Sequence, residues 1–122
     1  MGGSIGIVAR VPKEFDGFAY GSFMIKFTLF ENAQIDKDYL SYFLNSETME
    51  RIIRRNKIGA VQGNITIPTI KNLQIPLPPL EIQTAIANHI RNIRERAKTL
   101  ETEAKEIIEK AKAEVEKMIL GE

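Results

Sequence analysis

The chain has 122 residues, of which 43% are hydrophobic and 27% are charged, and its formal net charge at pH 7 is +1. This length suits one small packed domain with an appendage and is too short for two full domains. With no cysteine and one histidine, His89, the sequence excludes a disulfide scaffold, a thiolate metal site and a catalytic set of nucleophile, base and orienting group. We therefore predict a non-catalytic protein without a metal or a cofactor.

The sequence contains no sign of a membrane or export segment. No apolar run reaches the roughly 20 residues that a membrane-spanning helix needs, and the N-terminus lacks a basic segment followed by an apolar one. The absence of cysteine suits a reducing compartment, so we predict a cytoplasmic protein. The low net charge argues against an extensive, strongly basic surface for nucleic-acid binding, but it allows a local basic patch.

The first 43 residues contain all nine aromatic residues, and the sequence predicts extended structure in two stretches before Asp36. The stretch 4–11, "SIGIVARV", is rich in β-branched residues, and "PKEFDG" after it has the proline and the Asp-Gly pair of a turn. In the aromatic segment that follows, apolar and more polar positions alternate. One face of it would hold Phe23, Ile25, Phe27 and Leu29. This alternation predicts a half-buried β-strand.

Two short helices are predicted next. Asp36 is a suitable N-cap for the first, and its apolar residues have helical spacing: Tyr39, Leu40, Phe43 and Leu44. The second follows Ser46 and turns three apolar residues inward: Met49, Ile52 and Ile53. The segment 59–67 then returns to extended structure, with Gly59 and Gly63 at sharp backbone turns.

A proline-rich junction divides the chain at Leu80. Pro76, Pro78 and Pro79 cannot continue a helix, so they end the last predicted strand and stiffen the exit. Residues 81–122 contain no aromatic residue and no proline, and they predict one long helix with Glu81 in its first turn, where its charge opposes the helix dipole. The predicted fold is therefore α+β over 1–80, with about four strands and two helices, followed by a coiled-coil helix over 81–122.

Apolar residues of this long helix follow a 4,3 spacing over about four heptads, which is the pattern of a coiled coil. The predicted spacer or dimer interface consists of Ile86, Ile90, Ile93, Ala97, Leu100, Ala104, Ile107, Ala111 and Met118. Glu114 takes one place where an apolar residue is expected. A helix with one apolar stripe is poorly stable alone, so we expect a partner to cover it.

When the chain is alone, we expect an antiparallel homodimer through this stripe. Centred between Ala97 and Leu100, such a pair sets small residues against large ones in most layers, which evens the core volume. It also brings opposite charges together across the interface: Arg94 with Glu101, and Arg96 with Glu103. Glu114 would lie beside Gln83 of the second copy, whereas a parallel pair would set Glu114 against its own copy.

The cluster "RIIRRNK" at 51–57 is a candidate phosphate-contacting patch, because Arg and Lys neutralise the charge of the DNA backbone. Its basic members are Arg51, Arg54, Arg55 and Lys57. A solvated helix C-terminus, favoured by the helix dipole, explains the cluster equally well. Gln62 and Asn64, on either side of Gly63, can offer amides to adenine edges, and they are equally suited to a turn.

In their order along the chain, these segments resemble a known family. The stretches "GSIGIVARVPKEF", "DYLSYFLNS" and "GAVQGNITIPTIKNLQIPLPPLEIQTAIANHI" are similar to the second half of a target recognition domain, with its adjoining conserved helix, from the DNA-specificity subunit of type I restriction-modification systems. The most specific part is the "IPLPPLEIQ" junction at 75–83, followed by the heptad helix. In that family a recognition domain begins well before the Gly-Ser-Ile-Gly motif, so the resemblance implies that the first half of the domain is absent.

The resemblance implies a non-catalytic subunit that reads a specific sequence in double-stranded DNA. Its helices would space two recognition domains and hold the methyltransferase subunits and, through them, the restriction subunit. The residues leave one alternative open, which is a self-associating coiled-coil module that does not bind DNA.

Overall fold

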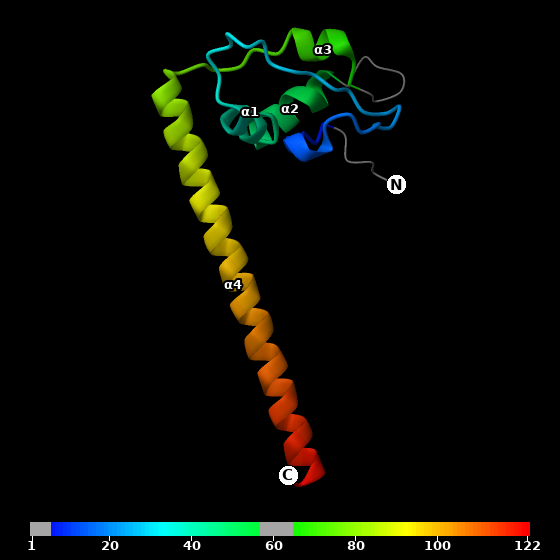
Figure 1. Cartoon of the computed structure of the whole chain (residues 1–122), viewed down its shortest axis with the longest axis vertical. Coiled ribbons are helices and arrows are strands. Elements are labelled where there is room, and N and C mark those ends of the chain that lie inside the picture. The colour runs from blue at the N-terminus through cyan, green and yellow to red at the C-terminus, as the bar shows by residue number, and fades with distance from the viewer. Residues whose placement is uncertain (1–5, 57–64) are drawn as a thin grey trace. The chain divides into compact units, whose positions relative to one another are not determined.

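The computed structural model describes residues 6–56 and 65–122, and every regular element that they form is a helix. The elements are the short 3-10 helix η1 (Lys13–Phe15) and the α-helices α1 (Lys37–Leu44), α2 (Glu47–Asn56), α3 (Ile67–Lys71) and α4 (Leu80–Leu120) (Figure 1). The chain divides into two compact units, Met1–Ala87 and Asn88–Glu122. The boundary between them falls inside α4.

The predicted α+β fold is wrong, because none of the residues in 6–56 and 65–122 forms a β-strand. In the aromatic segment, Phe23 lies in a turn that is closed by a hydrogen bond from the N–H of Met24 to the carbonyl oxygen of Gly21 at 3.0 Å. The exposed fraction is 95% at Phe23 and 45% at Phe27. From its expected buried face, Leu29 packs against the core. A β-sheet needs a second strand about 4.8 Å away to accept and donate its hydrogen bonds, so alternation alone does not make a strand.

The other predicted strands are also absent from residues 6–56 and 65–122. Val8, in the stretch 4–11, pairs with a side chain instead of a strand: its N–H donates to Asn45 Oδ1 at 2.9 Å, and its carbonyl accepts from Asn45 Nδ2 at 2.7 Å. The stretch that leads into the proline junction begins with helix α3, because Thr66 caps that helix and Pro68 suits its first turn. Most of the expected extended segment 59–67 lies outside the described residues.

The two predicted short helices are confirmed as α1 and α2. The Asp36 side chain caps α1 by accepting hydrogen bonds from the N–H groups of Asp38 and Tyr39, both at 2.9 Å. The two helices lie side by side in Figure 1 and form the core of the first unit through Leu40, Leu44, Met49 and Ile53. Partly buried residues pack around this core: Val8, Leu29, Ile35, Phe43, Ile52, Ile65, Leu73 and Ile75.

Gly6 lies where the chain crosses this core. Its φ is 87°, a left-handed conformation that residues with side chains rarely adopt. A Cβ atom at this position would lie 2.7 Å from Ile53 Cδ1. The last glycine of the Gly-Ser-Ile-Gly motif therefore has a structural role, because any larger residue would strain the backbone and displace a core side chain.

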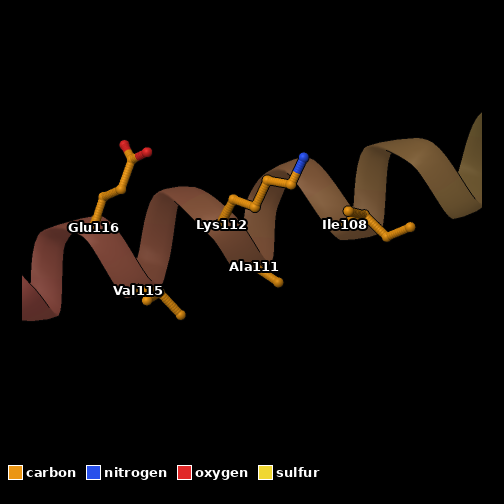
Figure 2. A pocket seen from close by; sticks show the side chains of 5 residues that line it. All are labelled: Ile108, Ala111, Lys112, Val115 and Glu116. Carbon is orange, nitrogen blue, oxygen red and sulfur yellow. The ribbon is translucent and has the colours of Figure 1, made fainter.

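The predicted long helix is present as α4, which runs for 41 residues from Leu80 to Leu120 and so measures roughly 60 Å at about 1.5 Å per residue. Glu81 lies in its first turn and Lys117 in its last, and both charges oppose the helix dipole. Near its C-terminal end, Ile108, Ala111 and Val115 lie along one edge of the helix (Figure 2). Across the described ranges, no helix combines the length and the apolar character of a membrane span.

The start of α4 is fixed within the first unit by the side chain of Gln83, which is 1% exposed. Its Oε1 accepts a hydrogen bond from the backbone N–H of Asp36 at 2.9 Å. Its Nε2 donates to the carbonyl oxygens of Gln34 and Pro78, at 3.2 and 2.8 Å. One amide thus joins the loop before α1, the proline junction and the first turn of α4.

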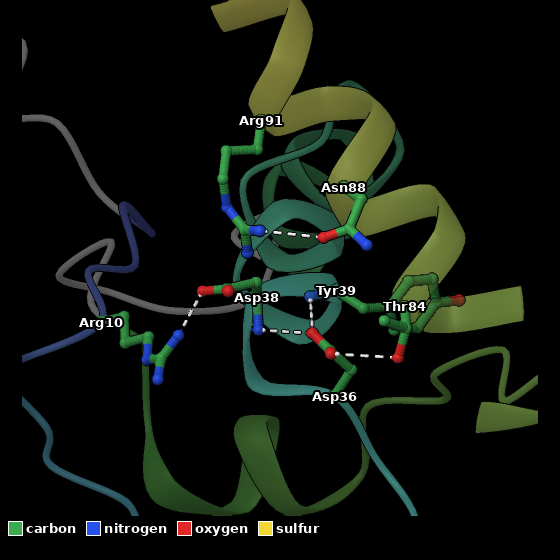
Figure 3. Close-up of polar contacts among 7 residues, drawn as sticks. All are labelled: Arg10, Asp36, Asp38, Tyr39, Thr84, Asn88 and Arg91. Atoms are coloured by element: carbon green, nitrogen blue, oxygen red, sulfur yellow. Dashed lines mark hydrogen bonds and ion pairs between the residues drawn. The ribbon is translucent and has the colours of Figure 1, made fainter. Parts of the chain in front are cut away.

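Two further hydrogen bonds reinforce this junction. The Thr84 hydroxyl donates to Asp36 Oδ2 at 3.4 Å, so the carboxylate that caps α1 also contacts α4, as Figure 3 shows. The hydroxyl of Tyr39, a buried residue of α1, donates to the carbonyl oxygen of Pro76 at 2.8 Å. The rigid proline segment is therefore held in place by side chains at both of its ends.

Replacing Gln83 with Leu should lower the free energy of unfolding of the first unit by about 1–3 kcal/mol, because three hydrogen bonds are removed and the Asp36 N–H is left without its partner. Urea unfolding followed by tyrosine fluorescence measures this decrease, since all three tyrosines lie before residue 43.

Thr84→Ala is the matched control, because it removes one long hydrogen bond of an exposed side chain and should cost less than about 0.5 kcal/mol. A Gln83→Leu chain as stable as the parent would show that the buried amide does not hold the junction.

Candidate functional site

The basic cluster occupies the outer face of α2. Arg51, Arg54 and Arg55 are exposed, whereas Met49 and Ile53 of the same helix are buried in the core. The orientation predicted from the spacing of apolar residues is therefore confirmed. The cluster presents guanidinium groups, which bind phosphate with two parallel hydrogen bonds.

Two of these arginines are paired with carboxylates one turn earlier. Arg51 donates to Glu47 at 2.6 Å, and Arg54 donates to Glu50 at 2.5 Å. Both pairs are exposed, and exposed pairs of this spacing contribute only about 0.3–0.5 kcal/mol, so a phosphate can compete for these arginines. Arg55 takes part in neither pair and is the arginine most directly available to an anion.

The position of the cluster suits a solvated helix C-terminus as well as a phosphate contact. Arg54 and Arg55 lie in the last turn of α2, where the helix dipole favours positive charge without any DNA. Lys57, Gln62 and Asn64, the other predicted DNA-binding residues, lie in 57–64, outside the described residues. Their roles stay predictions.

The stripe predicted as a spacer or dimer interface lies along α4. The exposed fraction is 55% at Ile93, 55% at Leu100 and 66% at Ile107. The other members are Ile86, Ile90, Ala97, Ala104, Ala111 and Met118, of which Ile90 is partly buried and the rest are exposed. Apolar stripes of this size on a surface are typical of contacts with another polypeptide.

Two residues next to this stripe were missed by the heptad pattern. Ile108 and Val115, whose exposed fractions are 54% and 53%, form an apolar hollow over Ala111. The rim of the hollow is completed by Lys112 and Glu116. The signal for them was present in the sequence, since Ile108 precedes Ala111 by three residues and Val115 follows it by four.

Gln83 has a different role from the one expected for it. The antiparallel pair predicted from the sequence sets it beside Glu114 of a second copy, but its amide is buried and bonded to Asp36, Gln34 and Pro78. A contact between Gln83 and Glu114 would have to break these bonds. Nothing in the local sequence distinguishes this glutamine from a solvated one in the first turns of a helix.

A second exposed apolar surface belongs to the aromatic segment. The exposed fraction is 71% at Phe18, 95% at Phe23 and 85% at Phe30. Phe15 and Phe18 meet edge to face, with their ring centroids 5.7 Å apart. Aromatic residues are enriched where proteins bind one another, so this segment is a further candidate contact surface.

The chemistry that these surfaces offer is binding. The guanidinium groups of α2 suit anions, and the apolar side chains of α4 suit another helix. His89 is exposed on α4. In the part of the chain that the structure describes, no three His, Asp or Glu side chains come together as a group that could hold a metal ion.

Comparison with known proteins agrees with the resemblance seen in the sequence. Residues 1–110 match the family described as the type I restriction modification DNA specificity domain. The chain is also 36% identical over 92 residues to the type I restriction enzyme MjaVIII specificity subunit of Methanocaldococcus jannaschii. That match covers 75% of this chain and 21% of the relative, so the chain spans about a fifth of the relative's length.

No solved structure matches the chain. The family match nevertheless extends over most of the sequence, from the first residue through the proline junction and well into α4. The chain therefore belongs to the family of type I restriction-modification DNA specificity domains.

Proposed function

We propose that the chain acts as a non-catalytic DNA-specificity subunit of a type I restriction-modification system, or as part of one, in the cytoplasm. In this role it reads a target in double-stranded DNA and holds the methyltransferase subunit and, through it, the restriction subunit. The proposal rests on the family match over residues 1–110. The exposed apolar stripe of α4 supports the assembly role, and the arginines of α2 support the DNA role.

For DNA binding, we assign two roles to different residues: the basic side chains hold the DNA backbone in position, and the amide side chains read the base sequence. Arg55, together with Arg54 and Lys57, would contact backbone phosphates, which gives affinity without sequence preference. Arg51 would join them when a phosphate displaces Glu47 from its exposed pair. Gln62 and Asn64 would read base edges in the major groove through their amides.

For assembly, the proposed contact is the stripe on α4. Each large aliphatic residue that becomes fully buried contributes roughly 1.5–3 kcal/mol, and Ile93, Leu100 and Ile107 are more than half exposed in the chain itself. A helix of the methyltransferase subunit that covers them would gain this burial. The charged residues on the other faces of α4 would stay in water.

The same stripe supports a second proposal, in which two copies of the chain form an antiparallel homodimer through α4 when no other subunit is present. Such a pair needs no DNA. The charges Arg94 and Glu101, and Arg96 and Glu103, would face each other across it. This is the alternative of a self-associating coiled-coil module.

Replacing Arg54, Arg55 and Lys57 with Ala should weaken binding to every DNA sequence. The same change should reduce the dependence of log affinity on log salt by up to about three units of slope, because each replaced side chain would neutralise one phosphate in the parent. Gel shifts of a duplex library at several salt concentrations measure both quantities.

The matched control replaces Lys105, Lys110 and Lys117 of α4, which removes the same charge from another part of the chain. An unchanged slope in the first variant, or an equal change in both, would remove the assignment of phosphate contacts to the α2 cluster.

Gln62→Ala and Asn64→Ala should change the preference among DNA sequences, at roughly 1–3 kcal/mol for each pair of hydrogen bonds between an amide and a base edge, and leave the salt slope as it is. Competition between duplexes that differ at single base pairs measures this preference. Equally weaker binding to all sequences would assign the two amides to a turn instead.

Ile93→Asp and Leu100→Asp together should abolish co-purification with the methyltransferase subunit of the same system, because two carboxylates would have to be buried in the contact. The first unit should unfold at the same urea concentration as in the parent, since both residues lie beyond Ala87.

Thr99→Asp and Thr102→Asp form the matched control, because they add the same charge on the face of α4 that lies away from the stripe, at about 100° per residue. Normal co-purification of the Ile93 and Leu100 variant would exclude the stripe as the assembly contact.

A further inference from the structure

We infer that the C-terminal part of α4 pairs with a second copy of the chain through Ile108, Ala111 and Val115, and not through the heptad positions Ile107 and Glu114. The inference rests on the proposed antiparallel self-association and specifies its register. Three observations support it: the direction in which these side chains leave the helix, the hollow that they form, and the distribution of charge along α4.

The direction follows from the geometry of a straight helix, in which successive residues are about 100° apart. The first part of the stripe fixes a centre line through Ile86, Ile93, Ala97 and Ala104. On this geometry Val115 lies about 20° from that line and Glu114 about 80°. Ile108 is likewise nearer, at about 40°, than Ile107, at about 60°. Glu114 therefore lies outside the apolar stripe, and Val115 lies within it.

The sequence repeats this pattern at intervals of 11 residues. Apolar residues recur along two such lines, which are Ile86, Ala97, Ile108 and Ile119, and Ile82, Ile93, Ala104 and Val115. An 11-residue repeat corresponds to about 3.67 residues per turn, close to the 3.6 of a straight helix, whereas a heptad repeat requires 3.5 and a left-handed supercoil. The stripe thus stays on one face of an almost straight α4.

The hollow has the arrangement that receives a side chain from a facing helix. Its members Ile108, Ala111, Lys112 and Val115 stand at positions i, i+3, i+4 and i+7, the four-residue hole of knobs-into-holes packing. Figure 2 shows Ile108, Ala111 and Val115 along one edge of α4, with Lys112 and Glu116 directed elsewhere. The small Ala111 forms the floor, so the hole accepts a large aliphatic side chain.

The register centred between Ala97 and Leu100 supplies that side chain. It places Ile86 of the second copy level with Ala111, and Ile82 of the second copy level with Val115. Both residues are accessible for this contact, with exposed fractions of 39% at Ile86 and 50% at Ile82. No partner is needed for Glu114, which stays in water at the side of the pair.

Charge favours a second copy in antiparallel orientation as the occupant. Residues 88–100 contain four basic side chains and one acidic side chain, whereas residues 101–122 contain four basic and seven acidic ones. An antiparallel pair sets the basic part of each helix along the acidic part of the other, twice by symmetry. A parallel pair would set the basic excess of 88–100 against the same basic excess of the other copy, and the acidic excess of 101–122 against the same acidic excess.

Sedimentation equilibrium of the whole chain tests the register. Ile108→Ser and Val115→Ser should each raise the dimer dissociation constant at least about tenfold, since every site occurs twice in the pair. Glu114→Leu should leave it within about twofold, as expected for an exposed position. Ala113→Ser, on the opposite face of α4, is the matched control, and circular dichroism checks that each variant keeps its helix content.

The chain has no cysteine, so single introduced cysteines give a second, direct readout. When Ile82→Cys chains are mixed with Val115→Cys chains and oxidised mildly, the mixed 82–115 product should predominate. Predominant 115–115 and 82–82 products would overturn the antiparallel orientation.

Two results would overturn the inference in distinguishable ways. Tighter association of Glu114→Leu together with unchanged association of Val115→Ser would restore the heptad register and leave self-association intact. A monomeric parent chain would overturn the register and the proposed homodimer together. The DNA-specificity proposal is tested separately by the gel shifts, which do not depend on this contact.

Discussion

The structure of the first unit depends on one buried amide, that of Gln83. An amide can accept a hydrogen bond and donate two at the same time, and this one uses all three on backbone groups from two separate segments, 34–36 and 78. A glutamate could not donate and a leucine could do neither. The prolines stiffen the junction, but they have no N–H to bond with, so the side chain of Gln83 supplies the specific contact that locates the first turn of α4 against the loop before α1.

The elements that depend on local interactions could be predicted from the sequence. The cap at Asp36 and the helical spacing of Leu40 and Leu44 depend on groups within one or two helical turns of each other, and helix α1 is confirmed. The long helix predicted from residue 81 onward is confirmed as α4. The predicted strands were wrong for residues 6–56 and 65–122, because a strand requires a partner elsewhere in the chain, which alternation within one segment does not supply. At Val8, the group that takes the place of such a partner is the side chain of Asn45, 37 residues away.

For the candidate surfaces, too, the sequence predicted the features that depend on local spacing and missed those that depend on the contacts of individual side chains. Periodicity placed the arginines of α2 outward and the stripe of α4 on one face, but it did not show that Glu47 and Glu50 already occupy two of the arginines. It also placed Gln83 beside Glu114 of a second copy, because its burial in the first unit depends on contacts with residues distant in the sequence, which periodicity does not reveal. The choice of a heptad period hid Ile108 and Val115, although an 11-residue period was readable from the same residues.

Residues 88–122 consist of the greater part of a single helix and have no second element to pack against within their own unit. Local bonds such as Arg91 to Asn88 and Lys112 to Glu109 are exposed, and pairs of this kind contribute only about 0.2–0.5 kcal/mol each. Burial of the stripe by a partner helix would contribute more than these pairs together, so binding and stability of α4 are linked. The three alanines of the stripe suit this role for two reasons. Alanine has the highest helix propensity, and its small side chain lets a partner helix approach closely. The residues that keep α4 helical in isolation are therefore also those that shape its surface for a partner.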